Sequence, residues 1–337
     1  MNSKLKLKKN HKIFQEYKLK KFMSLDFVKK LDFTSEYFDL YKLSESAYAA
    51  ISKKDSDMGG NAGFIDIEDY LILIDTTGNI NAAEELKKAA IQFTDKQPNF
   101  IVITHYHMDH LMGTTLFDKT TQIMTSDRTL KNIQTEGRKR LEELKNMDLT
   151  EMEDSLKNET DEAKRKDIEN DLIFIKSVCS PNFSIREPNI TFKEGCVIYG
   201  KGESVQMRTF KKAHTDGDVI VYIPEEKVLF SGDLLFARVD PWLGSGNPEG
   251  WISVNEEIMN MDFKVVVPGH GELASKKEFS LENKYIREIL DLVKKRIDAG
   301  EDPTQLKRED FSEELQSFNS SVLEWNLNYL TELLKKT

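Results

Sequence analysis

The sequence predicts a mixed α/β fold (α+β), in which two groups of short strands are combined with amphipathic helices. Short runs rich in valine, isoleucine and leucine recur in both halves of the chain, and several end directly at histidine or aspartate. Apolar residues recur at helical spacing over residues 80–93 and again from residue 278 onward. There is no internal repeat, and a chain of 337 residues allows one large or two modest domains with a real core.

Composition and charge narrow the class of protein. The net charge of −10 and the pI of about 5.3 argue against a nucleic-acid-binding surface. Residues 1–24 are nevertheless a basic N-terminal arm, expected to be solvated or a short packed helix, with contact to an anionic surface as the alternative. No apolar run is long enough to span a membrane and no secretory signal is evident, so a cytoplasmic location is expected. Cys179 and Cys196 are too few for a disulfide framework and are expected to be reduced core thiols.

The most informative stretch is residues 101–113, IVITHYHMDHLMG, where a buried strand is predicted to end in a cluster of metal ligands. His105, His107, Asp109 and His110 lie within six residues, although the chain has only six histidines. Alternation in an extended segment places His105 and His107 on the same side. Because imidazole and carboxylate groups are ordinary zinc ligands, the stretch predicts a metal site.

Three further residues follow strand-like runs in the second half of the chain. His214 lies in AHTDGD, Asp233 ends VLFSGD, and His270 lies in VVVPGHGE. Ligands at strand ends let a rigid sheet set the metal geometry while the loops vary. These three residues are therefore expected to join the same site.

The order HxHxDH, HT-x-G, SGD and PGHG, over roughly residues 40–280, resembles the metallo-β-lactamase superfamily. The resemblance implies a four-layer αββα sandwich over residues 25–280, with a helical insertion at about 128–178 and a helical C-terminal extension, 281–337, packed on the same domain. It also implies two Zn²⁺ ions per chain, with iron or manganese as alternatives. The implied ligands are His105, His107 and His214 for one metal and Asp109, His110 and His270 for the other, with Asp233 bridging both. Asp109 and Asp233 are the expected catalytic carboxylates.

Three segments around this site are expected to support it. Asp75 ends the buried run LILID and is expected to accept a hydrogen bond from a metal-bound imidazole, with a helix cap as the alternative. The glycine-rich loop 58–63, which contains Asn61, is expected beside the metals, or is an ordinary hairpin turn. The loop 236–251 is expected to form an apolar pocket wall through Trp242 or Trp251, or is a compact structural loop.

Residues 128–178 are densely charged and have apolar residues at helical spacing, which predicts two or three helices with a break near Asp148–Leu149. This insertion is expected to cap the pocket or to form a contact in a homodimer. A solvated helical excursion without a role in the chemistry is the alternative.

The expected reaction is hydrolysis by a metal-activated hydroxide of a carboxyl ester-type bond, a thioester or a lactone, in a small molecule. True zinc β-lactamases carry cysteine where this chain has Asp233 and usually lysine where it has Phe236, so β-lactam hydrolysis is an alternative. The glyoxalase II and lactonase branches share the aspartate, but Asp218 stands where they usually have a second histidine. The sequence is also compatible with an RNA-processing phosphodiesterase, a di-iron redox protein or a non-catalytic metal-binding protein.

Overall fold

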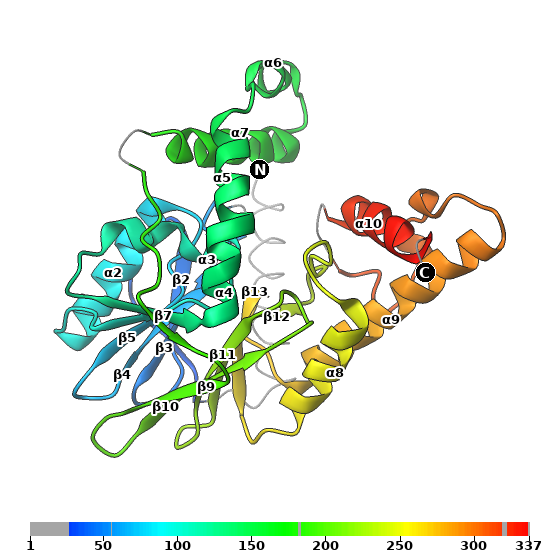
Figure 1. Ribbon diagram of the computed structural model, residues 1–337. Helices are drawn as coiled ribbons and strands as arrows, with labels where there is room; N and C mark the ends of the chain where they lie inside the picture. Colours follow the sequence, from blue (N-terminus) through cyan, green and yellow to red (C-terminus); the bar gives the residue numbers. More distant parts are fainter. Residues whose placement is uncertain (1–26, 55, 181–182, 319–321, 336–337) are drawn as a thin grey trace, which may run out of the picture.

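The computed structural model describes residues 27–54, 56–180, 183–318 and 322–335, so the basic arm predicted for residues 1–24 lies outside the described residues. Two β-sheets pack face to face, and helices cover the outer face of each sheet (Figure 1). This arrangement confirms the predicted αββα sandwich with a helical C-terminal extension. None of the helices in the described part has the length and apolarity that crossing a membrane requires.

The first sheet has eight strands in chain order. They are β1 (Lys29–Lys30), β2 (Phe38–Lys42), β3 (Ala47–Ser52), β4 (Ala62–Asp66), β5 (Leu71–Ile74), β6 (Phe100–Val102), β7 (Gln122–Ser126) and β8 (Ile190–Phe192). The strands from β1 to β5 pair antiparallel, whereas β5, β6, β7 and β8 pair parallel. The carboxyl ends of these parallel strands therefore meet at one edge of the sheet, and the metal-ligand motif follows β6 at that edge.

Helix α2 (Ile80–Thr94) connects β5 to β6 across the outer face of the first sheet. The side chain of Asn79 caps the helix by accepting hydrogen bonds from the backbone N–H groups of Asn81 and Ala82. One face of α2 is buried, with Ala82, Leu86 and Ala89 fully covered. This packing holds the helix against the sheet and returns the chain to the strand that carries the histidine motif.

The second sheet has five strands in the order β13-β12-β11-β10-β9. They are β9 (Gly195–Tyr199), β10 (Ser204–Phe210), β11 (Asp218–Ile223), β12 (Val228–Ala237) and β13 (Val265–Gly271). Strands β12 and β13 are parallel, and every residue of β12 is buried. The space between the sheets is filled by aliphatic and aromatic side chains from both, among them Ile65, Ile72, Val221 and Phe230. This core fixes the two halves of the metal site relative to each other.

The outer face of the second sheet is covered by α8 (Pro248–Met259), α9 (Lys276–Asp298) and α10 (Leu323–Lys335), with short 3₁₀ turns at Pro303–Gln305 and Arg308–Asp310. Helix α9 begins with a capping box in which the Ser275 and Glu278 side chains reach each other's backbone N–H groups. Its buried face, including Ile286 and Ile289, packs on the sheet. The C-terminal helices therefore share one core with the second sheet.

The insertion between β7 and β8, two neighbouring strands of the first sheet, is helical, as the sequence predicts. It contains α4 (Asp127–Asn132), a π-helical turn (Ile133–Gly137), α5 (Arg138–Lys145), α6 (Thr150–Asn158) and α7 (Glu162–Val178). The chain leaves helical conformation between α5 and α6, at the predicted break. Leu144 and Ile175 pack with Met108, which lies inside the histidine motif, and with Met112, two residues after it. The insertion is thereby attached beside the metal-ligand loop.

The prediction that both cysteines are core thiols is wrong. Cys179 is exposed just after the end of α7, and Cys196 is partly exposed on β9. Strand β9 is the edge of the second sheet, where one side has no neighbouring strand to cover it.

Candidate metal centre

The histidine motif changes from strand to helix at the edge of the first sheet. His105 and His107 lie in the extended segment after β6, whereas Asp109 and His110 lie in the short helix α3 (Met108–Leu111), which continues into a 3₁₀ turn (Met112–Leu116). The helical turn places Asp109 and His110 in a second group of donor atoms beside the group that contains His105 and His107. The motif can therefore serve two adjacent metal positions.

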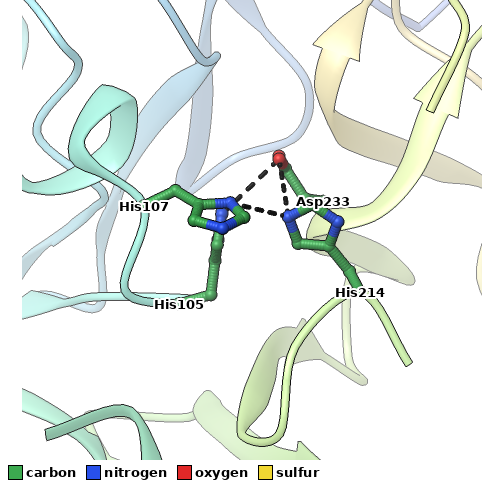
Figure 2. Close-up of side chains that lie close together, drawn as sticks. All are labelled: His105, His107, His214 and Asp233. Carbon is green, nitrogen blue, oxygen red and sulfur yellow. Dashed lines mark hydrogen bonds and ion pairs between the residues drawn. The ribbon is translucent and has the colours of Figure 1, made fainter. Parts of the chain in front are cut away.

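The first group of ligands is His105, His107, His214 and Asp233 (Figure 2). His214 Nε2 lies 2.9 Å from His107 Nδ1 and 3.2 Å from Asp233 Oδ2, and His105 Nε2 lies 3.5 Å from the same oxygen. The four donor atoms all lie within 4.8 Å of one another. Residues from both sheets thus converge, since His105 and His107 follow β6 while His214 and Asp233 come from the second sheet.

The second group is Asp109, His110, Asp233 and His270. His110 Nε2 lies 3.0 Å from Asp233 Oδ1 and 3.5 Å from Asp109 Oδ2. His270 Nε2 lies 3.1 Å from Asp109 Oδ2 and 3.5 Å from Asp233 Oδ2. The structure therefore brings together all seven predicted ligands, with the carboxylate of Asp233 between the two groups.

These residues fit a pair of divalent cations. The buried atoms His105 Nε2, His110 Nε2 and Asp233 Oδ1 lie close to one another but make no well-aligned hydrogen bond among the described residues, which is costly unless something else binds them. Tetrahedral zinc with bonds of about 2.1 Å separates its ligand atoms by about 3.4 Å, close to the separations within each group. A set of imidazoles and carboxylates suits a metal ion of borderline softness.

The electrostatics of the cluster also favour bound positive charge. Burial lowers the pKa of His214 to about 3 and that of His105 well below its usual value, which leaves both rings neutral and able to bind a metal. Burial also acts to lower the pKa of His110 and His270, but the neighbouring carboxylates outweigh it. Asp233 and Asp109 raise the pKa of His270 to about 9 and, with Asp75, that of His110 well above normal. The buried carboxylates therefore need cationic partners.

Asp75 lies beside the ring of His110. Its Oδ2 is 2.8 Å from His110 Nδ1, and the same carboxylate accepts hydrogen bonds from the backbone N–H and the hydroxyl of Thr104, each at 2.8 Å. Thr104 Oγ1 in turn lies 3.0 Å from His105 Nδ1. The pair Asp75 and Thr104 thus orients two ligand rings so that their Nε2 atoms face the cluster.

The loop 58–63 lies beside the cluster, but Asn61 does not make the expected contact with the pocket. Asn61 is buried and donates to the backbone carbonyls of Pro268 and Gly271 on either side of His270, so it supports that turn and does not line the cavity. The loop comes so close that a Cβ atom added at Gly60 would lie 2.3 Å from the ring of His110. This contact explains the glycine at position 60.

The two tryptophans of the loop 236–251 have different positions. Trp242 lines the cavity above the cluster. Trp251 does not, because α8 turns it inward: it is fully buried, its ring packs edge-on against His214 with centroids 5.0 Å apart, and its Nε1 donates to the Leu234 carbonyl. Phe236 stacks on the ring of His270 at a centroid distance of 4.7 Å. Trp251 and Phe236 therefore support ligand rings.

Three residues that the sequence did not assign to the site also contact its parts. Ser245 Oγ lies 3.0 Å from His107 Nε2, and buried Glu282 of α9 accepts a hydrogen bond from the backbone N–H of Phe236. Asp218, in place of the second histidine, accepts from the backbone N–H and hydroxyl of Thr215 and so stabilises the turn after His214. No motif marks Ser245 or Glu282, because their roles arise from contacts between distant segments.

A cavity of about 650 Å³ opens above the cluster. Its floor contains four of the seven ligands, His107, Asp109, Asp233 and His270. Its walls come from the loop 236–251, from the insertion helices and from the segment before α10. The insertion therefore borders the cavity.

Comparison with known proteins agrees with this architecture. The family model described as the metallo-beta-lactamase superfamily matches residues 56–270, most of the chain, and the chain belongs to this family. Members of the superfamily are metal-dependent hydrolases, and the histidine and aspartate groups of this chain are suited to binding metal ions. No curated protein matches the chain significantly.

Solved structures show the same fold. VMB-1 matches with a TM-score of 0.55 and 17% identity, over 75% of this chain and 98% of its own. TMB-1 matches with 0.54 and 14%, over 75% and 98%. The DIM-1 metallo-β-lactamase matches with 0.54 and 13% identity, over 76% and 99%. At these identities the likeness establishes the fold of the chain and not its substrate.

Proposed function

We propose that the chain is a dinuclear zinc-dependent hydrolase that cleaves a carboxyl ester-type bond, a thioester or a lactone, in a small molecule. The observation that carries the proposal is the convergence of seven imidazole and carboxylate ligands in two groups that share Asp233, with four of the seven on the floor of one cavity. Two bound metal ions would act as Lewis acids and lower the pKa of a water molecule toward neutrality.

The chain's own residues would orient the reactants. Asp233 is almost fully buried between the two groups and would hold both sides of the centre at a fixed separation. The Asp109 side chain is 33% exposed and lines the cavity, so its carboxylate is placed to orient the attacking water. The water oxygen would bond to the acyl carbon as the bond to the sulfur or oxygen leaving group breaks, and the proton of the water would pass to that group.

Phe236 favours this reaction over β-lactam hydrolysis. A lysine at this position would offer a cation to a substrate carboxylate, whereas the Phe236 ring is stacked on His270 and offers none. The recognition of an anionic β-lactam therefore lacks its usual partner at this position.

The test is a panel of thioesters, lactones, β-lactams and a phosphodiester reporter, assayed with the zinc-loaded full chain and combined with metal analysis. We expect about two zinc equivalents per chain, turnover of thioesters or lactones, and loss of one equivalent in Asp109→Ala. Turnover confined to the β-lactams or to the phosphodiester would overturn the proposed substrate class. Metal content below one equivalent after zinc loading would overturn the dinuclear centre.

A further inference from the structure

The cavity above the metal centre has a polar floor and a predominantly apolar upper wall. Beyond the ligands, its inner wall is formed by aliphatic and aromatic side chains from three separate parts of the chain. They are Met108 and Leu144 with Phe174 on the side of the insertion, Val239 and Trp242 in the loop after β12, and Val322 before α10. Charged side chains of the insertion, such as Lys139 and Glu143, also line the cavity and are exposed to solvent.

Several of these apolar groups remain partly exposed in the folded chain. Phe174, Val239, Trp242 and Val322 are each only partly buried, although the neighbouring cores contain many fully buried side chains. Binding is favourable when a ligand displaces water from apolar surface that faces one shared cavity. Contiguous exposed apolar surface of this kind marks a binding site more often than scattered single residues do.

Within the insertion, the apolar residues differ in whether they face the cavity. Its helices are densely charged, and α6 has no buried residue, so they are mostly solvated. On α7, however, Phe174 lines the cavity while its neighbour Ile173 is 44% exposed and does not line it. Two adjacent apolar residues of one helix thus differ in whether they can reach a ligand above the metal centre.

We infer that the substrate carries an apolar acyl chain, which lies against Phe174, Val239 and Trp242 while its carbonyl carbon stands over the metal centre. The inference deepens the proposed hydrolysis and rests on it for the position of the carbonyl group. The acyl side is assigned to the apolar wall because the rest of the lining includes the charged, solvent-exposed residues Lys139 and Glu143, beside which the leaving group is placed. A polar leaving group suits that exit, whereas a long alkyl chain does not.

Binding affinity should depend on the length of the acyl chain by a predictable factor. Burial of one methylene group is worth a factor of about four in affinity, so each added carbon should strengthen binding by about that factor until the wall is covered. The carboxylic acid product of the reaction tests this without turnover, because its carboxylate would bind at the centre and its chain along the wall.

The experiment measures binding of unbranched alkanoates, from acetate to decanoate, to the zinc-loaded full chain by titration calorimetry. Wild-type affinity should rise about fourfold per methylene. Phe174→Ala should reduce this dependence, and Val239→Ala, in the loop after β12, should do so independently of any change in the insertion. Ile173→Ala, a matched change on the same helix, should leave the series unchanged, and thermal melting should show that all three variants fold.

A flat series in the wild type, or an equal loss of chain-length dependence in Ile173→Ala, would overturn the inference. A pair of mirrored esters tests the orientation: preference for octyl acetate over methyl octanoate would overturn the assignment of the acyl side. Failure of the proposed function is distinguishable. If affinity rises steeply with chain length but no thioester, lactone or ester is hydrolysed, the apolar binding wall is supported and the proposed hydrolysis is wrong. If substrate is hydrolysed but affinity does not change with chain length, the hydrolysis is supported and the apolar wall is wrong.

Discussion

The floor and the upper wall of the cavity are built in different ways. The ligands of the floor and those behind it come from the turn after β6 with helix α3, from the loop before β11, and from strands β12 and β13. Three of them, His105, His110 and His214, do not line the cavity and are almost completely buried. The wall is made from helices and loops, and several of its apolar side chains remain partly exposed. The rigid sheets therefore position the groups that hold metal, while the helices and loops added to the sandwich provide the surface that recognises a substrate. Changes in the floor should therefore alter metal binding, and changes in the wall should alter specificity.

Asp233→Ala should have the largest effect, because this carboxylate is shared by both ligand groups. Metal analysis should show loss of both ions, and activity on the best substrate should fall about a thousandfold or more. Asp216→Ala removes an exposed carboxylate two residues after His214 and should leave both measurements unchanged. Full metal content in Asp233→Ala would contradict the expectation that changes in the floor alter metal binding.

Asp75→Ala should have the next largest effect. It removes the acceptor that orients the ring of His110 and leaves the buried donors of Thr104 without their partner. Loss of such support lowers metal affinity about 10–100-fold, which a competition titration with a chelating dye measures. Asp69→Ala, in an exposed turn, is the control. Unchanged affinity in Asp75→Ala would mean that the ligand rings are held in place by packing alone.

Ser245→Ala sharpens the comparison, because Ser245 belongs to the loop of the wall but contacts a ligand of the floor. A single net hydrogen bond is worth about 1 kcal/mol, so we expect metal affinity or kcat to fall about fivefold. Ser253→Ala, exposed on α8, should change neither. A loss as large as that in Asp233→Ala would instead place Ser245 among the groups that act directly on the substrate.

The smallest effect should come from Glu282→Gln, which tests the helical layer behind the floor. Burial raises the pKa of Glu282 well above its usual value, although the backbone N–H of Phe236 and the Asn255 side chain oppose the shift. The folded state therefore holds this proton more tightly than the unfolded state. As a result, the free energy of unfolding should fall as pH rises from about 4.5 through the raised pKa.

Glu282→Gln removes this titration while keeping an acceptor for the N–H of Phe236. Denaturant unfolding between pH 5 and pH 8 should therefore show a smaller loss of stability in the variant than in the wild type. Glu249→Gln, exposed on α8, should follow the wild-type curve. Parallel curves for Glu282→Gln and the wild type would show that Glu282 does not titrate differently on folding.

Periodicity in the sequence predicted the helical insertion with its break, and the resemblance of its motifs to a known family implied the sandwich and the grouping of the seven ligands. The ligand motifs themselves are local. Four of the ligands fall within six residues, and each of the others follows a recognisable apolar run, so short-range geometry already limits where their side chains can lie. The apolar run LILID likewise predicts that Asp75 lies at the end of a buried strand.

The supporting contacts required the folded chain. Trp251 and Trp242 stand in one loop region with similar surroundings in sequence, yet α8 buries the first behind His214 and leaves the second at the cavity. Asn61 holds the turn around His270 from the opposite half of the sequence, and Glu282 reaches Phe236 from another layer. Such contacts depend on how helices and sheets pack across long separations in the chain, which neither periodicity nor local motifs encode.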